Sequence, residues 1–365
     1  FPSFLFSIFG GVLSDRYNRY IIMLATQGAS LVQALLLTWI VYINEFAIWH
    51  ILALSTVLGI VNAFDVPARQ ALVYDLVDKK EYLPNAIALN SSMVHAARLI
   101  GPAISGIALE KFGTATCFLI NALSFLAVIF SLLAMRLPPY KNRTHVNNAL
   151  KDLGNGFEYL KDTPAIKNIM LMLAAVSFFS LPYITLLPVF AKQIFHGEAS
   201  TFGYLNSFVG LGALTGALFL ASLRSGTNLK RVLLISTVVF GLGLVTFSLV
   251  SDLSGALVLI ALTGFGMMAQ TTISNTLIQT TVAPAMRGRV LSYYAMAFFG
   301  MQPLGGLVVG AISHYAGAPQ TLFWQGIITL IIAIVFSPFL RRNDLNPNQR
   351  MKMEQLEERT LETTS

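Results

Sequence analysis

The sequence predicts an all-α, polytopic membrane protein. Of its 365 residues, 55% are hydrophobic and only 11% are charged, whereas soluble domains carry about 25% charged residues. The charges are also unevenly placed, because 18 of the 41 lie in residues 138–167 and 341–365. A water-soluble fold could not cover the long apolar runs that remain. A β-barrel is excluded as well, since stretches such as Ile327 to Phe336 lack the alternating pattern of barrel strands.

The apolar runs define the expected spans, since a bilayer core about 30 Å thick needs about 20 apolar residues per helix. Breaks at charged and turn residues give eleven spans, at residues 1–13, 20–43, 47–74, 84–109, 113–136, 164–191, 200–223, 230–250, 253–282, 288–314 and 319–340. The first is too short to cross the bilayer at about 1.5 Å per residue. We expect part of that span and one preceding helix to be missing, which would bring the complete protein to about twelve spans.

The placement of lysine and arginine sets the expected orientation, because cytoplasmic loops collect positive charge. With the loop at residues 14–19 inside, 20 of the 24 basic residues lie on the inner side. Lys111 and Lys192 lie outside, and Arg69 and Arg98 lie within spans. We therefore expect a protein of the inner (cytoplasmic) membrane with a cytoplasmic carboxy terminus. The net charge of +7 reflects this topology and gives no reason to expect nucleic acid binding.

The chain divides into two halves of similar layout. We expect an amino-terminal helical bundle at 1–137, a cytoplasmic linker at 138–163, a carboxy-terminal bundle at 164–341 and a cytoplasmic tail at 342–365. Apolar linker residues recur at helical spacing and predict an amphipathic helix on the inner membrane surface: Leu150, Leu153, Phe157 and Leu160. A shift of 204 residues places Gly101, Gly106 and Gly113 on Gly305, Gly310 and Gly317, which indicates a parallel repeat.

A short charged turn joins the first two expected spans. Its sequence is Gly10-Gly11-Val12-Leu13-Ser14-Asp15-Arg16-Tyr17-Asn18-Arg19. Glycines let helices approach closely, Asp15 can stabilise a helix amino terminus, and the arginines supply inward-facing charge. The alternative is a loop that only obeys the positive-inside rule, but an aspartate beside two arginines in so short a turn favours a motif.

This turn resembles the hallmark of the major facilitator superfamily, Gly-x-Leu-Ala-Asp-Arg-x-Gly-Arg, which lies between the second and third helices of that family. Asn18 replaces the usual second glycine, a mild departure because asparagine tolerates a left-handed backbone. The resemblance implies the major facilitator fold, in which two six-helix bundles rock around a central site. As a hypothesis, a gate stabilises the outward-facing state: Asp15 engages the helix after residues 287–289, and Arg19 pairs with Asp75. The gate residues are then Gly11, Asp15, Arg16, Arg19, Asp75, Arg287 and Arg289.

The span at residues 84–109 carries a second motif, which resembles the antiporter motif of exporters in this superfamily. It consists of small residues around a Gly-Pro pair: Ala88, Ala97, Gly101, Pro102, Ser105 and Gly106. Small residues permit close helix approach, and the proline weakens the helix so that it can bend. Ordinary helix packing is the alternative, since alanine replaces glycine twice and serine replaces it once.

Further segments resemble the subgroup that contains the enterobactin exporter and macrolide efflux proteins. They lie in the first half and the central linker, at Phe64 to Val73, Leu83 to Ala86, Ala97 to Pro102 and Gly156 to Pro164. The resemblance covers essentially the whole chain at the level of the fold. It does not identify a substrate.

Charged residues inside spans are costly and are functional candidates by default. Asp65 and Arg69 lie one helical turn apart, and Arg98 lies in mid-span. Asp65 could pair with either arginine and exchange protons during turnover, or the three could form a fixed structural network, which the i,i+4 spacing supports equally. Uncharged polar residues are expected to line a cavity or to bond neighbouring helices: Asn62, Asn90, Tyr183, Asn206, Gln270, Thr271, Asn275 and Gln302.

These features predict a secondary active transporter that works by alternating access. The favoured form is a proton-coupled exporter of a small organic molecule, drug-like or siderophore-like, acting as a monomer in the lipid bilayer with no cofactor, metal or nucleic acid. No ATP-binding or hydrolase motif occurs, so we expect neither an ATP-driven pump nor an enzyme. Two alternatives stay open: an importer or facilitator of the same fold, and a transport-inactive receptor or assembly protein.

Overall fold

The computed structural model describes residues 17–43, 47–76, 82–135, 157–224, 226–283 and 286–341, with isolated positions before residue 17. Nine helices in this described part are long and apolar enough to cross a membrane. One of them, Ala96–Ala134, contains two of the expected spans. The expected spans from residue 20 onward are therefore all helical, and most of the expected short span at 1–13 lies outside the described residues.

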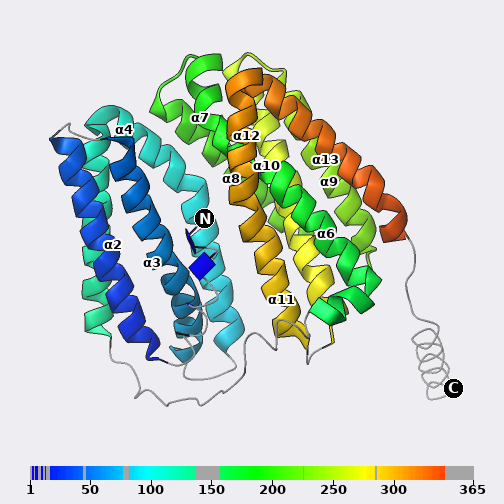
Figure 1. The fold of residues 1–365 in the computed structure, drawn as a ribbon, viewed down its shortest axis with the longest axis horizontal. Coiled ribbons are helices and arrows are strands. Elements are labelled where there is room, and N and C mark those ends of the chain that lie inside the picture. Colours follow the sequence, from blue (N-terminus) through cyan, green and yellow to red (C-terminus); the bar gives the residue numbers. More distant parts are fainter. Residues whose placement is uncertain are drawn as a thin grey trace.

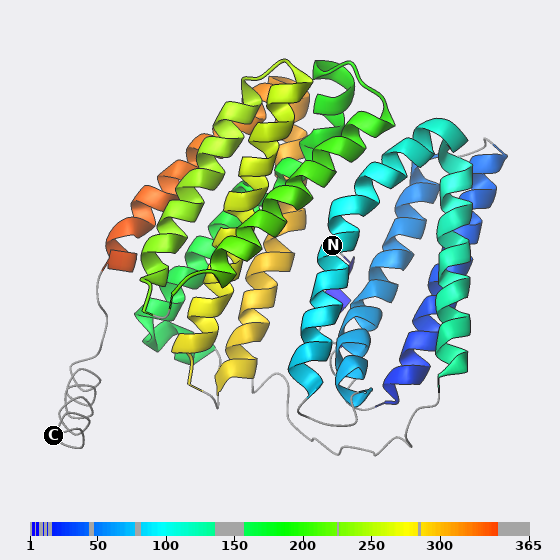
Figure 2. The same cartoon turned by 180° about the vertical axis from the view of Figure 1, so that it is seen from behind.

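The helices form two groups that stand side by side (Figure 1). The amino-terminal group contains α2 (Arg19–Tyr42), α3 (Ile48–Asp75) and α4 (Leu83–Ala134). The carboxy-terminal group contains α6 (Pro164–Phe179), α7 (Leu187–Val189), α8 (Ala199–Ala221), α9 (Leu229–Ser248), α10 (Leu253–Thr281), α11 (Arg287–Ala295), α12 (Met301–Ala316) and α13 (Ala318–Arg341). The view from behind shows that α4 and α8 are the helices through which the two groups approach each other (Figure 2).

Glycine ends corresponding helices in the two halves. Gly113 interrupts α4 with φ 77° and ψ 170°, which separates it into the two expected spans. Gly317 follows α12 with φ 82° and ψ 155°. Only glycine adopts such positive-φ backbone without steric cost. The two positions are 204 residues apart, so the backbone repeats the register that the glycine pattern indicates.

The span expected as one helix at residues 164–191 is irregular, which corrects that expectation. Helix α6 ends at Phe179, and a 3₁₀ segment (Leu181–Leu186), the single turn α7 and a π-helical segment (Phe190–Ile194) follow it. Pro182 and Pro188 explain the change, because proline lacks the N–H that an α-helix needs in its interior. A second π segment, Met296–Gly300, lies between α11 and α12, and such segments are frequent at functional sites.

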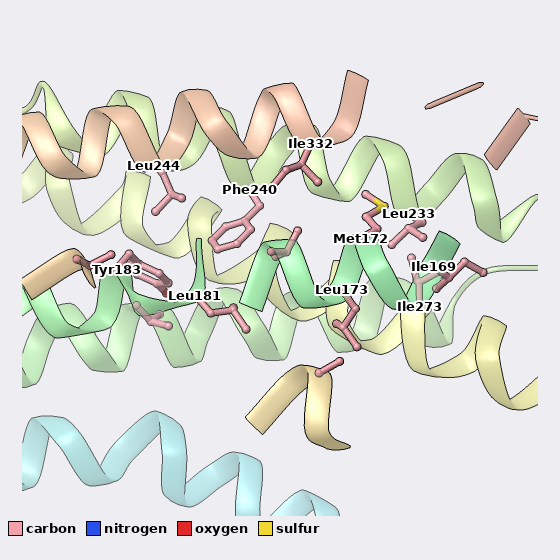
Figure 3. Packing of buried hydrophobic residues seen from close by; sticks show 14 of the residues in the cluster. Ile169, Met172, Leu173, Leu181, Tyr183, Leu233, Phe240, Leu244, Ile273 and Ile332 are labelled. Atoms are coloured by element: carbon pink, nitrogen blue, oxygen red, sulfur yellow. The ribbon is translucent and has the colours of Figure 1, made fainter. Parts of the chain in front are cut away.

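The main apolar core lies inside the carboxy-terminal group (Figure 3). Tyr183 packs edge-on against Phe240 of α9, with ring centroids 5.9 Å apart. Glycines bring the backbones together around this core, and a Cβ on Gly266 would lie 2.5 Å from the Phe240 nitrogen. A smaller cluster joins α2, α3 and the end of α4: Ile22, Met23, Ala68, Leu72 and Leu132.

The last turn of the linker lies against the carboxy-terminal group. Phe157 contacts Tyr293 of α11, with ring centroids 6.3 Å apart, and Leu160 is buried. The Tyr159 hydroxyl accepts a hydrogen bond from the Ala283 backbone N–H at 3.2 Å. Leu150 and Leu153, the first half of the expected amphipathic helix, lie outside the described residues.

Candidate functional site

Asp65 is the centre of a polar cluster between α2 and α3. Its Oδ1 accepts hydrogen bonds from the Thr26 hydroxyl at 2.9 Å and from the Gln27 amide at 2.8 Å. Its Oδ2 accepts from Nε and Nη2 of Arg69 at 3.1 and 2.6 Å. The carboxylate is buried, whereas 53% of the Arg69 side chain is exposed. The cluster therefore links α2 to α3. Its four donors occupy the roughly four acceptor positions that a carboxylate offers.

Arg98 does not join this cluster. Within the part of the chain that the structure describes, no hydrogen bond or ion pair is formed by its guanidinium. Its side chain is exposed in the middle of the first half of α4. Asp65 thus pairs with Arg69, and the network of all three residues that the sequence also allowed does not form among the described residues.

The antiporter-like motif of α4 lies directly against α8. A Cβ on Gly106 would lie 2.7 Å from the Ala199 carbonyl oxygen, and one on Gly203 would lie 2.5 Å from the Pro102 carbonyl oxygen. The Ser207 hydroxyl accepts a hydrogen bond from the Ala103 backbone N–H at 3.0 Å. The contact ends near Gly210, where a Cβ would lie 2.9 Å from the Arg98 carbonyl oxygen. We call this contact the α4–α8 seam: residues 98–106 of α4 and 199–210 of α8.

The motif residues Ala97, Gly101 and Ser105 lie on a different face of α4 from the residues that contact α8. The side chain of Ala88 lies outside the described residues. Gly101 is half-buried, and no atom lies within 4 Å of the place where its Cβ would be. Ala97 and Ser105 are exposed. The motif therefore supplies small residues on two faces of α4. One face contacts α8, and the other, with Ala97, Gly101 and Ser105, is not covered by the described residues.

The expected gate is only partly described. Gly11, Asp15 and Arg16 lie outside the described residues, as do the side chains of Asp75 and Arg287. Arg19 begins α2, and the Arg289 guanidinium lies 3.3 Å from the Met286 sulfur. Asn18 has φ −63° and ψ 113°, and its side chain accepts from the Tyr20 N–H at 3.0 Å. The left-handed backbone suggested for Asn18 is thus wrong, and the residue acts as the N-cap of α2.

The uncharged polar candidates are spread over both groups. Tyr183 and Gln270 are fully buried in the carboxy-terminal group, so they line no open cavity in this structure. Asn206 donates to the Phe202 carbonyl oxygen at 3.0 Å, and Asn275 accepts from Gln279 at 2.6 Å. Thr271 donates to the Met267 carbonyl oxygen at 2.9 Å. Asn62 and Asn90 are exposed, and Gln302 is half-buried.

A cavity of about 450 Å³ lies between α2 and α3. Its lining is apolar except for Asn18 and Thr26, and Thr26 is also a partner of Asp65. The apolar lining residues are Leu13, Tyr17, Ile21, Ile22, Ala25, Ala29, Ile60, Val61 and Phe64. The cavity thus adjoins the Asp65 cluster but offers few groups that could orient a polar molecule.

The transmembrane secretion effector family matches residues 1–364. The chain belongs to this family. Its relatives include the staphyloferrin A transporter of Staphylococcus aureus, 28% identical over 92% of this chain and 84% of the relative. The family and these relatives are transporters of the major facilitator type, so the chain is a multi-pass membrane transporter and not an enzyme.

Two further relatives are exporters by name. Macrolide efflux protein A of Streptococcus pyogenes is 23% identical over 90% of this chain and 83% of the relative. The enterobactin exporter EntS of Shigella flexneri is 26% identical over 89% of this chain and 77% of the relative. The crystal structure of the POT family transporter PepTSo has a TM-score of 0.69 and 13% identity, with 93% of this chain and 87% of PepTSo covered. That likeness confirms the all-α major facilitator fold.

The α8 side of the seam was not identified from the sequence. Gly203 and Gly210 are two turns apart and Ser207 lies between them, so all three lie on one face of the helix. Such small-residue spacing in a membrane helix indicates a close helix contact. It could have pointed to α8 as the partner of the motif in α4.

Proposed function

We propose that this transporter exports a small organic molecule from the cytoplasm by alternating access. The observation that carries the proposal is the α4–α8 seam. It joins the two helical groups through glycine contacts at the end where α8 begins, which is the outer end in the expected orientation. Inward of the seam, the α8 side chains that continue its α4-facing row are less covered: Leu214 is half-buried and Ala221 is exposed. This arrangement supports a state that is closed outside and open inside.

Export as the direction is supported by the relatives, two of which carry efflux or export in their names. In this proposal the substrate is drug-like or siderophore-like, the residues 1–137 and 164–341 form the two rocking bundles, and the protein is a monomer. It lies in the cytoplasmic membrane with its carboxy-terminal tail inside. The closest alternative, an importer or facilitator, shares the fold and differs in the direction and energy source of the flux.

We further propose that proton entry drives export. Among the side chains that the structure describes, Asp65 is the buried acidic group, so it is the candidate proton carrier. Protonation would remove the charge that holds Arg69 and would loosen the tie between α2 and α3. The charged turn with Asp15 would act as the gate that stabilises the outward-facing state.

The test is a flux measurement with the full chain in cells that lack their own exporters. Cells loaded with staphyloferrin A, enterobactin or a macrolide should lose at least one of them faster when the chain is present, and a protonophore should abolish the difference. Faster uptake, or loss that the protonophore does not change, would favour the importer or facilitator. No flux of any compound would favour the transport-inactive receptor.

The proposed gate is tested by Asp15→Asn, which should slow export at equal protein level. Unchanged export by this variant would contradict the gate.

A further inference from the structure

Arg98 is a cation at membrane depth without a partner among the residues that the structure describes. Its side chain is exposed, and it forms no hydrogen bond or ion pair with any residue that the structure describes. Asp65 cannot serve as its partner here, because Thr26, Gln27 and Arg69 occupy that carboxylate. Intramembrane charges usually pair with one another or mark a path for substrate or ions. Arg98 therefore needs an explanation other than pairing with the described residues.

Arg98 also lies at the inner limit of the α4–α8 seam. Its carbonyl oxygen faces Gly210, and from there outward the two helices stay in close contact through Pro102, Gly106 and Gly203. Arginine side chains on a helix lean toward its amino terminus, which in α4 is the direction away from the seam. The guanidinium thus points inward from the seam, which closes the outer end of the space between the two helical groups.

Helix geometry shows on which side of the seam Arg98 lies. At about 100° per residue, Arg98 is roughly 80° from the row of Leu99, Pro102 and Gly106 that faces α8. Exposed Ile100 and Ile104 are on the other side of that row. Arg98 therefore shares the side of α4 that carries Ser105, and the apolar residues occupy the side suited to lipid.

The same reasoning places Asn206 of α8 beside Arg98. Asn206 is roughly 70° from the α4-facing row of Gly203, Ser207 and Gly210, on the side where Val209 contacts Gly264 of α10. Because α4 and α8 run antiparallel, this is the same side of the seam as Arg98. Exposed Leu211 lies on the opposite side, as Ile100 does on α4. Arg98 and Asn206 thus point into the space that α10 borders.

We propose that Arg98 is the anion-binding residue of the transport site and that the exported molecules are organic anions with carboxylate groups. This inference rests on the proposed export function and deepens it. The guanidinium presents a planar fork of donors that fits a carboxylate with two parallel hydrogen bonds, and Asn206 supplies an amide across the seam. A bound anion supplies the counter-charge that the described residues lack.

Binding is measured with the purified full chain in detergent, by fluorescence polarisation of carboxyfluorescein, with the cation ethidium as the opposite probe. The chain should bind carboxyfluorescein, and Arg98→Gln should weaken binding about tenfold or more, as expected for the loss of a hydrogen bond to a charged group. Arg98→Lys should recover part of the affinity because it keeps the charge. Arg231→Gln, which removes the same charge from the exposed start of α9, is the matched control and should leave binding unchanged.

Three outcomes would overturn the anion site: no binding of carboxyfluorescein, binding that Arg98→Gln leaves intact, or a preference for ethidium. Dye flux in proteoliposomes separates this inference from the export function. Arg98-dependent binding without flux would leave the site standing and reject the transporter. Ethidium flux that is independent of Arg98 would support export and reject the organic-anion class.

Discussion

At the scale of single residues, the Asp65 carboxylate combines burial with a full set of donors. Thr26 and Gln27 hold one oxygen from α2, and Arg69 holds the other from the next turn of α3. A carboxylate with all its acceptor positions occupied is well suited to a structural role. To carry a proton it must first lose the contact with Arg69, whose exposed side chain can leave without crossing the core. The geometry therefore supports two roles that mutants can separate.

We predict that Asp65→Asn lowers the stability of the protein by about 1–3 kcal/mol, the cost of an unpaired partner. The figure stays below that for a fully buried ion pair, because 53% of the Arg69 side chain is exposed. The double variant Asp65→Asn with Arg69→Gln should recover most of this stability. Thermal unfolding followed by size-exclusion chromatography gives the comparison.

Flux assays on the same variants assign the role. If Asp65 carries the proton, the double variant stays unable to use a proton gradient even though it is folded. If the pair is purely structural, the double variant exports at the wild-type rate and still responds to a protonophore. Gradient-driven export by the double variant would therefore show that Asp65 is not the proton carrier.

At the scale of elements, the α4–α8 seam is where one side chain can decide the distance between the two helical groups. A Cβ on Gly203 would lie 2.5 Å from the Pro102 carbonyl oxygen and 3.1 Å from the Gly106 Cα, so any larger residue must push the helices apart. Gly310 of α12 is the contrasting case, since no atom lies within 4 Å of its Cβ position. The two glycines form a matched pair for mutation.

We predict that Gly203→Val slows export about tenfold or more, while Gly310→Val stays close to the wild type. Overpacking at a tight contact costs about 1–3 kcal/mol, and here that cost falls on the state in which the seam is closed. Single-turnover efflux at equal expression measures the difference. Equal rates for the two variants would show that closure of the seam does not limit transport.

The elements also show what sequence patterns can and cannot predict. Hydropathy located every described span, because apolar length is set by bilayer thickness, and the glycine pattern matched the breaks at Gly113 and Gly317. The irregular stretch after Phe179 was missed, because an apolar run looks alike whether its backbone is α, 3₁₀ or π; Pro182 and Pro188 were the available signal. The bonds of Asp65 to Thr26 and Gln27 depend on how α2 and α3 pack, which spacing within one helix does not reveal.

At the scale of the whole molecule, the two halves repeat the same helix layout but differ in their interior side chains. Gly113 and Gly317 break the chain in the same way 204 residues apart, yet the large apolar core lies in the carboxy-terminal half and the Asp65 cluster lies in the other. The described contact between the halves is concentrated in the seam, where small residues make a dry and reversible contact feasible. Movement of the carboxy-terminal group against the amino-terminal helices fits this division.

We predict that a covalent bond across the seam stops this movement. Ala103→Cys and Ser207→Cys place two thiols where the Ser207 hydroxyl now lies 3.0 Å from the Ala103 N–H, in a background with Cys117→Ser, since Cys117 is the only other cysteine. Oxidation should form a disulfide and abolish export, and a reductant should restore it, because alternating access requires the seam to open. Each single-cysteine variant should export normally under both conditions. Export that continues in the cross-linked protein would mean that the two halves need not separate at the seam.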